Sequence, residues 1–120
     1  MIPKVSEPID FSVLALLEEY SSAEDDLIAT LITDYKKDYL SLLATLTQAA
    51  AANNLQDFND TAHGLKSISA SLGMARVSQV CEGFEGLKSF SSKEAEQIQS
   101  LRIEIENALQ MLTDRRSSKV

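Results

Sequence analysis

The stretch that decides the fold is LQDFNDTAHGLKSISASL, residues 55–72. Its apolar and small residues recur at intervals of three and four, which is the repeat of one face of an α-helix. They are Leu55, Phe58, Ala62, Leu65, Ser69 and Leu72. Asn53 and Asn54 precede this stretch and can end one helix and cap the next. Gly73 follows it, where a left-handed residue commonly stops a helix. We therefore predict an amphipathic helix over residues 55–72.

Helix signals continue on the N-terminal side of this stretch. Asp10 can cap a short helix over residues 11–20. Ser21 and Glu24 have the spacing of a capping box, in which a hydroxyl and a carboxylate each bind the other residue's backbone amide. This spacing predicts a long helix that begins near residue 23 and runs to about residue 52.

Two more helices are expected on the C-terminal side. The first should cover about residues 75–89, with Val80 on its apolar stripe. The second should cover about residues 92–114, because Ser91 and Glu94 again have capping-box spacing.

These helices indicate an all-α fold. Four amphipathic helices joined by short turns predict an antiparallel up-down-up-down four-helix bundle, with the short helix over 11–20 as an additional N-terminal helix. Both prolines lie within residues 1–9, which we interpret as a linker or leader. The bundle domain is predicted over 10–114, and residues 115–120 are predicted to form a flexible tail.

Composition excludes several functional classes. The net charge of −7 argues against a nucleic-acid partner, since a phosphate backbone would repel the chain. Cys81 is the single cysteine, so an intrachain disulfide or a thiolate metal site is not expected. No signal peptide is visible, and no apolar run reaches the roughly 18 residues that a membrane span needs. We expect a cytoplasmic domain without direct membrane insertion.

The sequence offers little catalytic chemistry of its own. It contains no Gly-rich phosphate loop, no HExxH and no CxxC. With one histidine and no nucleophile elbow, a hydrolytic triad is not expected either. We predict that the domain is not an enzyme and holds no metal or cofactor.

His63 is the residue that carries the functional hypothesis. At roughly 100° per residue, it falls roughly 130° from the centre of the apolar stripe, so it should face solvent. An exposed neutral imidazole has a free nitrogen lone pair and is a competent phosphoryl acceptor. Lys66 lies one turn away, on the shoulder of the stripe, and can offset the added negative charge.

Other residues on the His63 side form a predicted partner surface. Gly64 and Ser67 are small enough for a partner's active site to approach the imidazole closely. The remaining members share the helix side of His63, and they are Gln56, Asn59, Asp60 and Ala70.

A longer pattern resembles a known family. TAHGLKSISASLGM, residues 61–74, is similar to the signature helix of histidine phosphotransfer (HPt) domains, which reads roughly A-H-x-L-K-G-S-x-x-x-L-G-A. Val77, Cys81 and the pair Phe84-Glu85 are similar to the family's following L-x-x-x-C-x-x-L-E. The upstream helices also fit, and the resemblance covers about residues 10–112. Ser67 replaces the family's glycine, which leaves the approach to the histidine open.

The resemblance implies a reaction and its partners. His63 would accept a phosphoryl group from an aspartyl phosphate of one receiver domain and pass it to the Asp of another, in a response regulator. The receiver would supply Mg²⁺ and most of the catalytic groups, so this domain would be a phosphocarrier. We expect a monomer, because the single histidine must be accessible, and the domain would be either free-standing or tethered as the C-terminal domain of an inner-membrane hybrid sensor kinase.

Other interpretations of the same sequence compete with this one. A non-phosphorylated helical module could dock receiver domains without carrying phosphate. The dimerising domain of a sensor kinase also phosphorylates a helical histidine, but it typically has an acidic residue directly after the histidine and a proline five residues after it. Here Gly64 and Ile68 occupy those places. The phosphorylated domain of chemotaxis kinases is closer in shape, yet the pattern around Cys81 resembles the relay type more.

Overall fold

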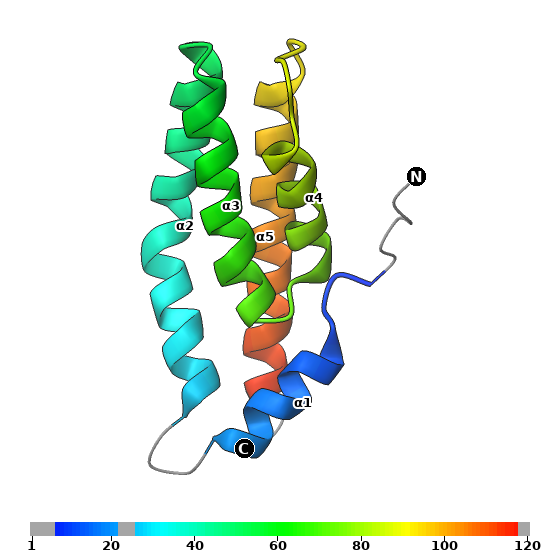
Figure 1. Cartoon of the computed structure of the whole chain (residues 1–120). Helices are drawn as coiled ribbons and strands as arrows, with labels where there is room; N and C mark the ends of the chain where they lie inside the picture. Colours follow the sequence, from blue (N-terminus) through cyan, green and yellow to red (C-terminus); the bar gives the residue numbers. More distant parts are fainter. Residues whose placement is uncertain (1–6, 22–25, 118–120) are drawn as a thin grey trace.

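The computed structural model describes residues 7–21 and 26–117, and in this part of the chain it contains five α-helices and no strand. The helices are α1 (Phe11–Tyr20), α2 (Leu27–Ala51), α3 (Leu55–Ser71), α4 (Ala75–Glu85) and α5 (Glu94–Ser117). Helices α2 to α5 run alternately up and down, and α1 lies across the lower end (Figure 1). The predicted all-α bundle with an additional N-terminal helix is confirmed.

Side chains close the helix ends where the sequence suggested caps. The Asp10 carboxylate accepts a hydrogen bond from the Ser12 amide at 3.0 Å, and α1 begins at the next residue after Asp10. The Asn54 side chain accepts from the Asp57 amide at 3.1 Å and caps α3. These bonds satisfy amides that the first turn of a helix leaves without a partner. The predicted starts of both helices are therefore confirmed.

Helix α2 begins later than predicted. Its cap is Asp26, and the start expected near residue 23 is about four residues early. Ser21 ends α1 instead of opening α2, and its hydroxyl accepts from the Leu27 amide at 3.2 Å. Glu24, the other half of the proposed capping box, lies outside the described residues.

The N-terminal segment is tied to the turn between α3 and α4. Gly73 has a left-handed φ of 72°, as its place after the helix predicted. The Asp10 amide donates to the Gly73 carbonyl at 2.7 Å, and a Cβ on Gly73 would lie 2.8 Å from the Asp10 carbonyl oxygen. Ile9, which we assigned to the leader, is only 1% exposed. The packed part of the chain therefore includes at least this last residue of the predicted leader.

The C-terminal helix runs further than predicted. Helix α5 continues to Ser117, so residues 115–117 are helical and not a flexible tail. Two nitrogens of Arg115 bind one Glu18 oxygen, at 2.8 and 3.2 Å. The guanidinium also lies 5.2 Å from the ring centroid of Phe11. These contacts fasten the end of α5 to α1.

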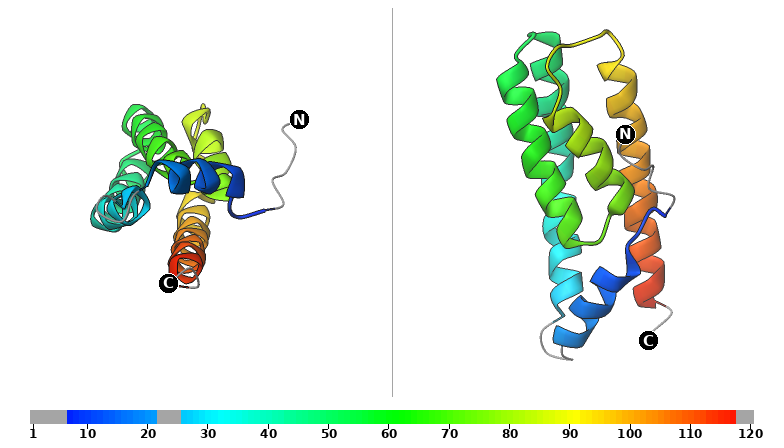
Figure 2. Two further views of the ribbon diagram at one scale, coloured as in Figure 1. Left: turned by 90° about the horizontal axis from the view of Figure 1, so that it is seen from below. Right: turned by 45° about the vertical axis from the view of Figure 1, so that its right-hand side comes forward.

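Helix α3 is the centre of the packing. Its most extensive contacts are with α4 and α2, while α4 touches α5 at fewer points. Viewed from below, α1 crosses the end of the bundle formed by α2 to α5 (Figure 2). An open groove of about 1570 Å³ lies between α4 and α5. Among the described helices, none is long and apolar enough to cross a membrane.

Candidate functional site

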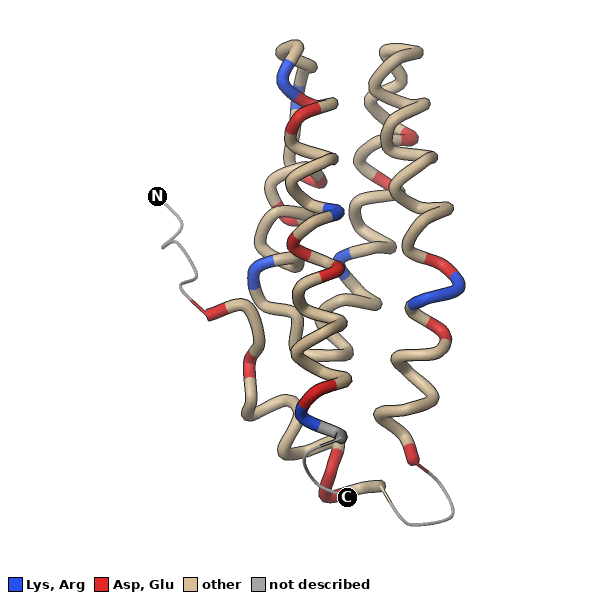
Figure 3. The backbone as a smooth tube through the Cα atoms, turned by 180° about the vertical axis from the view of Figure 1, so that it is seen from behind, with Lys and Arg blue, Asp and Glu red and all other residues tan. Residues whose placement is uncertain are grey.

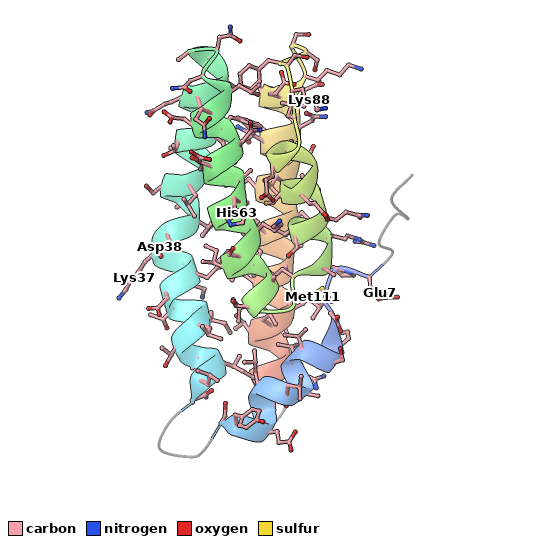
Figure 4. The ribbon with its side chains drawn as sticks, in the orientation of Figure 1. Glu7, Lys37, Asp38, His63, Lys88 and Met111 are labelled. Carbon is pink, nitrogen blue, oxygen red and sulfur yellow. The ribbon has the colours of Figure 1, made fainter. Side chains whose placement is uncertain are left out.

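His63 lies on the outer face of α3, near the middle of the bundle's length (Figure 4). Its side chain is 61% exposed. The apolar face of α3 points the other way, and its buried members are Phe58, Ala62, Leu65 and Ser69. The helical angle that predicted an exposed histidine is therefore confirmed.

A carboxylate from α4 holds His63 and Lys66 together. Glu85 Oε1 lies 2.6 Å from His63 Nδ1, and Glu85 Oε2 lies 2.5 Å from Lys66 Nζ. Each oxygen therefore binds one group of α3. Because Glu85 is the last residue of α4, the end of that helix sets where this carboxylate can reach.

Hydrogen bonds within this cluster shift the pKa values of Glu85 and Lys66 so that both are charged at neutral pH. The hydrogen bond from Lys66, followed by that from His63, lowers the pKa of Glu85 below its ordinary value. The same bond with Glu85 raises the pKa of Lys66. At neutral pH the carboxylate is thus ionised and can only accept hydrogen bonds, which assigns the proton to His63 Nδ1. In the neutral imidazole, the lone pair then lies on Nε2.

The other predicted partner-surface residues lie on α3, before and after His63 along the helix. The Gln56 amide donates to both oxygens of Asp60, at 3.0 and 3.1 Å, in an exposed pair. The Ser67 hydroxyl donates to the His63 carbonyl at 3.1 Å. Gly64 has open space where a Cβ would lie. Ala70 is exposed on the same helix. This surface therefore has small side chains next to the histidine.

Asn59 has a different place from the one predicted. It is half-buried, and its amide donates to the carbonyls of Phe84 and Leu87, at 2.8 and 3.2 Å. Both donor hydrogens are used within the domain, so they are not offered to a partner. Helix α4 ends at Glu85, four residues before the predicted end at residue 89. Asn59 therefore binds one carbonyl in the last turn of α4 and one just beyond its end, and the Phe84 carbonyl also accepts from the Leu87 amide at 3.2 Å.

Glu85 is the residue of this cluster that reasoning from spacing missed. It lies 22 positions after His63, on another helix, and nothing in the helical repeat relates the two. The sequence signal for it was the family pattern L-x-x-x-C-x-x-L-E, whose final acidic residue corresponds to Glu85. That pattern includes Glu85 but assigns it no contact.

The core near α3 contains a buried hydrogen bond and a buried thiol. The Tyr35 hydroxyl and the Ser69 hydroxyl are 3.0 Å apart in a buried hydrogen bond between α2 and α3. Cys81 is fully buried, and burial raises the pKa of its thiol to about 12. It remains a neutral thiol at physiological pH, as expected for a small buried hydrophobe.

The basic residues and the possible metal ligands do not gather into clusters in the described part of the chain (Figure 3). Figure 3 shows the basic residues of the described part scattered over several helices, without a continuous stripe. The described residues contain no group of three or more His, Cys, Asp or Glu side chains that could hold a metal ion.

Comparison with known proteins identifies the family of this chain. A family model described as the Hpt domain matches residues 30–115. No curated protein matches the chain. Among solved structures, the chain is similar to the crystal structure of histidine-containing phosphotransfer protein B from Pseudomonas aeruginosa PAO1, with a TM-score of 0.70 and 23% identity. That alignment covers 95% of this chain and 98% of the other. The chain therefore belongs to the Hpt domain family, the histidine phosphotransfer modules of phosphorelays.

Proposed function

We propose that His63 Nε2 is the phosphoryl acceptor of this domain. In this proposal, it takes the group from the aspartyl phosphate of one receiver domain and passes it to the aspartate of a response regulator. The observation that carries the proposal is the ionised Glu85 bound to His63 Nδ1. Since this contact keeps the proton on Nδ1, the nucleophilic lone pair lies on Nε2 of a largely exposed ring.

The transfer step balances without an added acid or base. The Nε2 lone pair attacks phosphorus, the N–P bond forms, and the bond from phosphorus to the aspartate oxygen breaks. The aspartate leaves as a carboxylate, and the imidazole keeps its Nδ1 proton and gains one positive charge. Glu85 stands 2.6 Å from that nitrogen and stabilises the charge as it develops. The reverse step passes the group to the second aspartate.

Lys66 supplies the compensating charge on this side of the transfer. A phosphoryl group adds about two negative charges at neutral pH. Lys66 lies one turn from His63, and its ammonium is already held at the site by Glu85. We propose that it offsets part of the phosphoryl charge, a contribution that acts through space and does not require a direct contact.

The proposed partners are receiver domains, with which Hpt domains work in phosphorelays. We propose that it acts as a monomeric phosphocarrier between the receiver of a hybrid sensor kinase and that of a response regulator. The receiver provides Mg²⁺ and the remaining catalytic groups. The proposed docking surface surrounds His63 and consists of Gln56, Asp60, Gly64, Ser67 and Ala70. Its small members let a receiver's active site come close to Nε2.

Phosphoryl transfer from a phosphorylated receiver domain tests the proposal, with wild type and His63→Gln measured side by side. We expect acid-labile, base-stable label on wild type only. His63→Gln should keep its helical circular dichroism and its denaturation midpoint, because the replaced side chain is mostly exposed.

Two outcomes would count against this proposal. Label on the His63→Gln variant would move the acceptor to another residue. No label on wild type, with receivers that demonstrably bind it, would leave a docking module that carries no phosphate.

A further inference from the structure

We infer that Asn59 is a positioning residue for phosphoryl transfer, because it fixes the end of α4 at the place from which Glu85 reaches His63. This inference rests on the proposed function of His63. It concerns a residue that sequence reasoning placed on the partner surface, and it assigns that residue to the interior of the site instead.

Asn59 binds the backbone on both sides of Glu85 in the sequence. Its amide donates to the carbonyl of Phe84, directly before Glu85, and to that of Leu87, two residues after it. Asn59 and His63 are four residues apart on α3, so they lie on the same side of that helix. One side of α3 therefore grips the backbone around Glu85 and also binds its carboxylate.

The end of α4 is closed first by its own backbone, since the Gly86 amide donates to the Glu82 carbonyl at 3.1 Å and the Leu87 amide donates to the Phe84 carbonyl at 3.2 Å. The last carbonyls of a helix lack amide partners within the helix, and such ends fray when nothing else binds them. Toward α5, this segment borders the open groove, whose lining includes Gly83, Phe84 and Leu87. The support from a neighbouring helix comes from α3, where the Phe58 ring lies 5.1 Å from the ring of Phe84.

The two kinds of support act differently. The Phe58–Phe84 contact is apolar and fixes the approach of the two helices, but it tolerates small rotations of α4. The Asn59 amide makes two directional bonds, and these fix the backbone on both sides of Glu85. Loss of the amide should therefore release the carboxylate from His63 while the core remains packed.

The test is the variant Asn59→Leu, which has nearly the same size and no donor, with Asn59→Ala as a second variant in case the first folds poorly. The first readout is the tautomer of His63 from its imidazole ¹⁵N chemical shifts in the free domain. The second is the rate of phosphoryl uptake from a phosphorylated receiver. We expect a smaller Nδ1–H population and an uptake rate about tenfold lower, the scale typical of lost support to a reacting group.

A double-mutant cycle with Glu85→Ala separates positioning from other effects. If Asn59 acts through Glu85, Asn59→Leu should change neither readout further in the Glu85→Ala background. Tyr35→Phe is the matched control, because it removes a buried hydrogen bond to α3 that does not involve Glu85. It should leave the tautomer and the uptake rate unchanged.

Three results would overturn the inference. They are an unchanged tautomer and rate in Asn59→Leu, an equal effect with and without Glu85, and a slower rate with an unchanged tautomer, which would mean that Asn59 contacts the partner. The tautomer is measured without phosphate. If wild type failed to accept phosphate, the proposed function would be wrong. The effect of Asn59 on the His63 tautomer could still be measured, so the two failures are distinguishable.

Discussion

The two sides of α4 differ sharply. Toward α3, the Phe84 ring packs against Phe58, and Glu85 at the end of the helix binds two groups of the site. Toward α5, Val80 is 37% exposed, and the helix borders a groove of about 1570 Å³. Helix α4 is thus positioned mainly by one neighbour. The geometry at His63 should depend on the contact between α3 and α4 and very little on the contact between α4 and α5.

The largest expected effect comes from the α3 side of this comparison. Phe58→Ala removes a fully buried ring that packs against Phe84 and Phe90, both at 5.1 Å between centroids. It should lower the free energy of unfolding by about 3–5 kcal/mol. Val80→Ala, on the groove side, should change it by only about 0.5 kcal/mol. Urea denaturation of both variants measures the difference, and equal losses would refute the asymmetry.

The second prediction concerns the contact of α3 with its other neighbour, α2, and how much it contributes to the free energy of unfolding. Tyr35→Phe leaves the buried Ser69 hydroxyl without its partner and should cost about 1–2 kcal/mol of unfolding free energy. The double variant Tyr35→Phe/Ser69→Ala should recover part of that loss, since no unpaired hydroxyl remains. No recovery would show that the cost comes from packing and not from the hydrogen bond.

A glycine on α3 and a glycine on α4 allow the same substitution to be made near His63 and away from it. Gly64 on α3 and Gly83 on α4 both have open space where a Cβ would lie. Alanine should therefore stabilise the domain by about 0.5–1 kcal/mol at either helix position. Phosphoryl uptake should slow in Gly64→Ala, where the methyl group lies beside the proposed acceptor, and stay unchanged in Gly83→Ala. Unchanged uptake in Gly64→Ala would remove Gly64 from the docking surface.

The smallest expected effect is a pH dependence of stability. The pKa of Glu85 is lowered from its ordinary value of 4.5, chiefly by Lys66 and then by His63. Its contribution is therefore present above about pH 4.5 and is lost as the pH falls through the lowered pKa. Wild type should lose stability faster than Glu85→Gln in that acidic range. Urea midpoints measured across it would show parallel curves if the carboxylate contributes nothing.

Glu94 provides the control for this experiment at the start of α5. Burial raises the pKa of Glu94, but hydrogen bonds from the Ser91 amide and hydroxyl lower it more, so the net shift is downward. Glu94→Gln should therefore also flatten the acidic fall in stability. Only Glu85→Gln should alter phosphoryl uptake.

Local rules predicted much of this structure from sequence. The exposure of His63 follows from its angle on one helix, and the caps Asp10 and Asn54 follow from residue type and position. Both depend on neighbours within a few residues. Ser91 and Glu94 also interact as their spacing suggested, since the Glu94 carboxylate accepts from the Ser91 amide at 2.9 Å.

The rest depended on contacts between distant residues. The early end of α4 involves Asn59, which lies 25 positions before the Phe84 carbonyl that it binds. Val80 was expected on an inward stripe, but a helical repeat does not say which neighbour packs closely, and here the α5 side is open. Glu85 was missed as a site residue for the same reason, because its partners lie on another helix.

The shared carboxylate has a consequence for recognition. Glu85 binds Nδ1 of His63 and the ammonium of Lys66, and neither atom is the proposed acceptor nitrogen. On this chemistry, the loaded and empty domains keep the same internal contacts and present nearly the same shape. A partner can then tell them apart only by the phosphoryl group and the charge at an exposed site, where the group brings about two negative charges and the ring gains one positive charge. Salt screens such charges, so a partner's preference for the loaded domain should narrow as ionic strength rises.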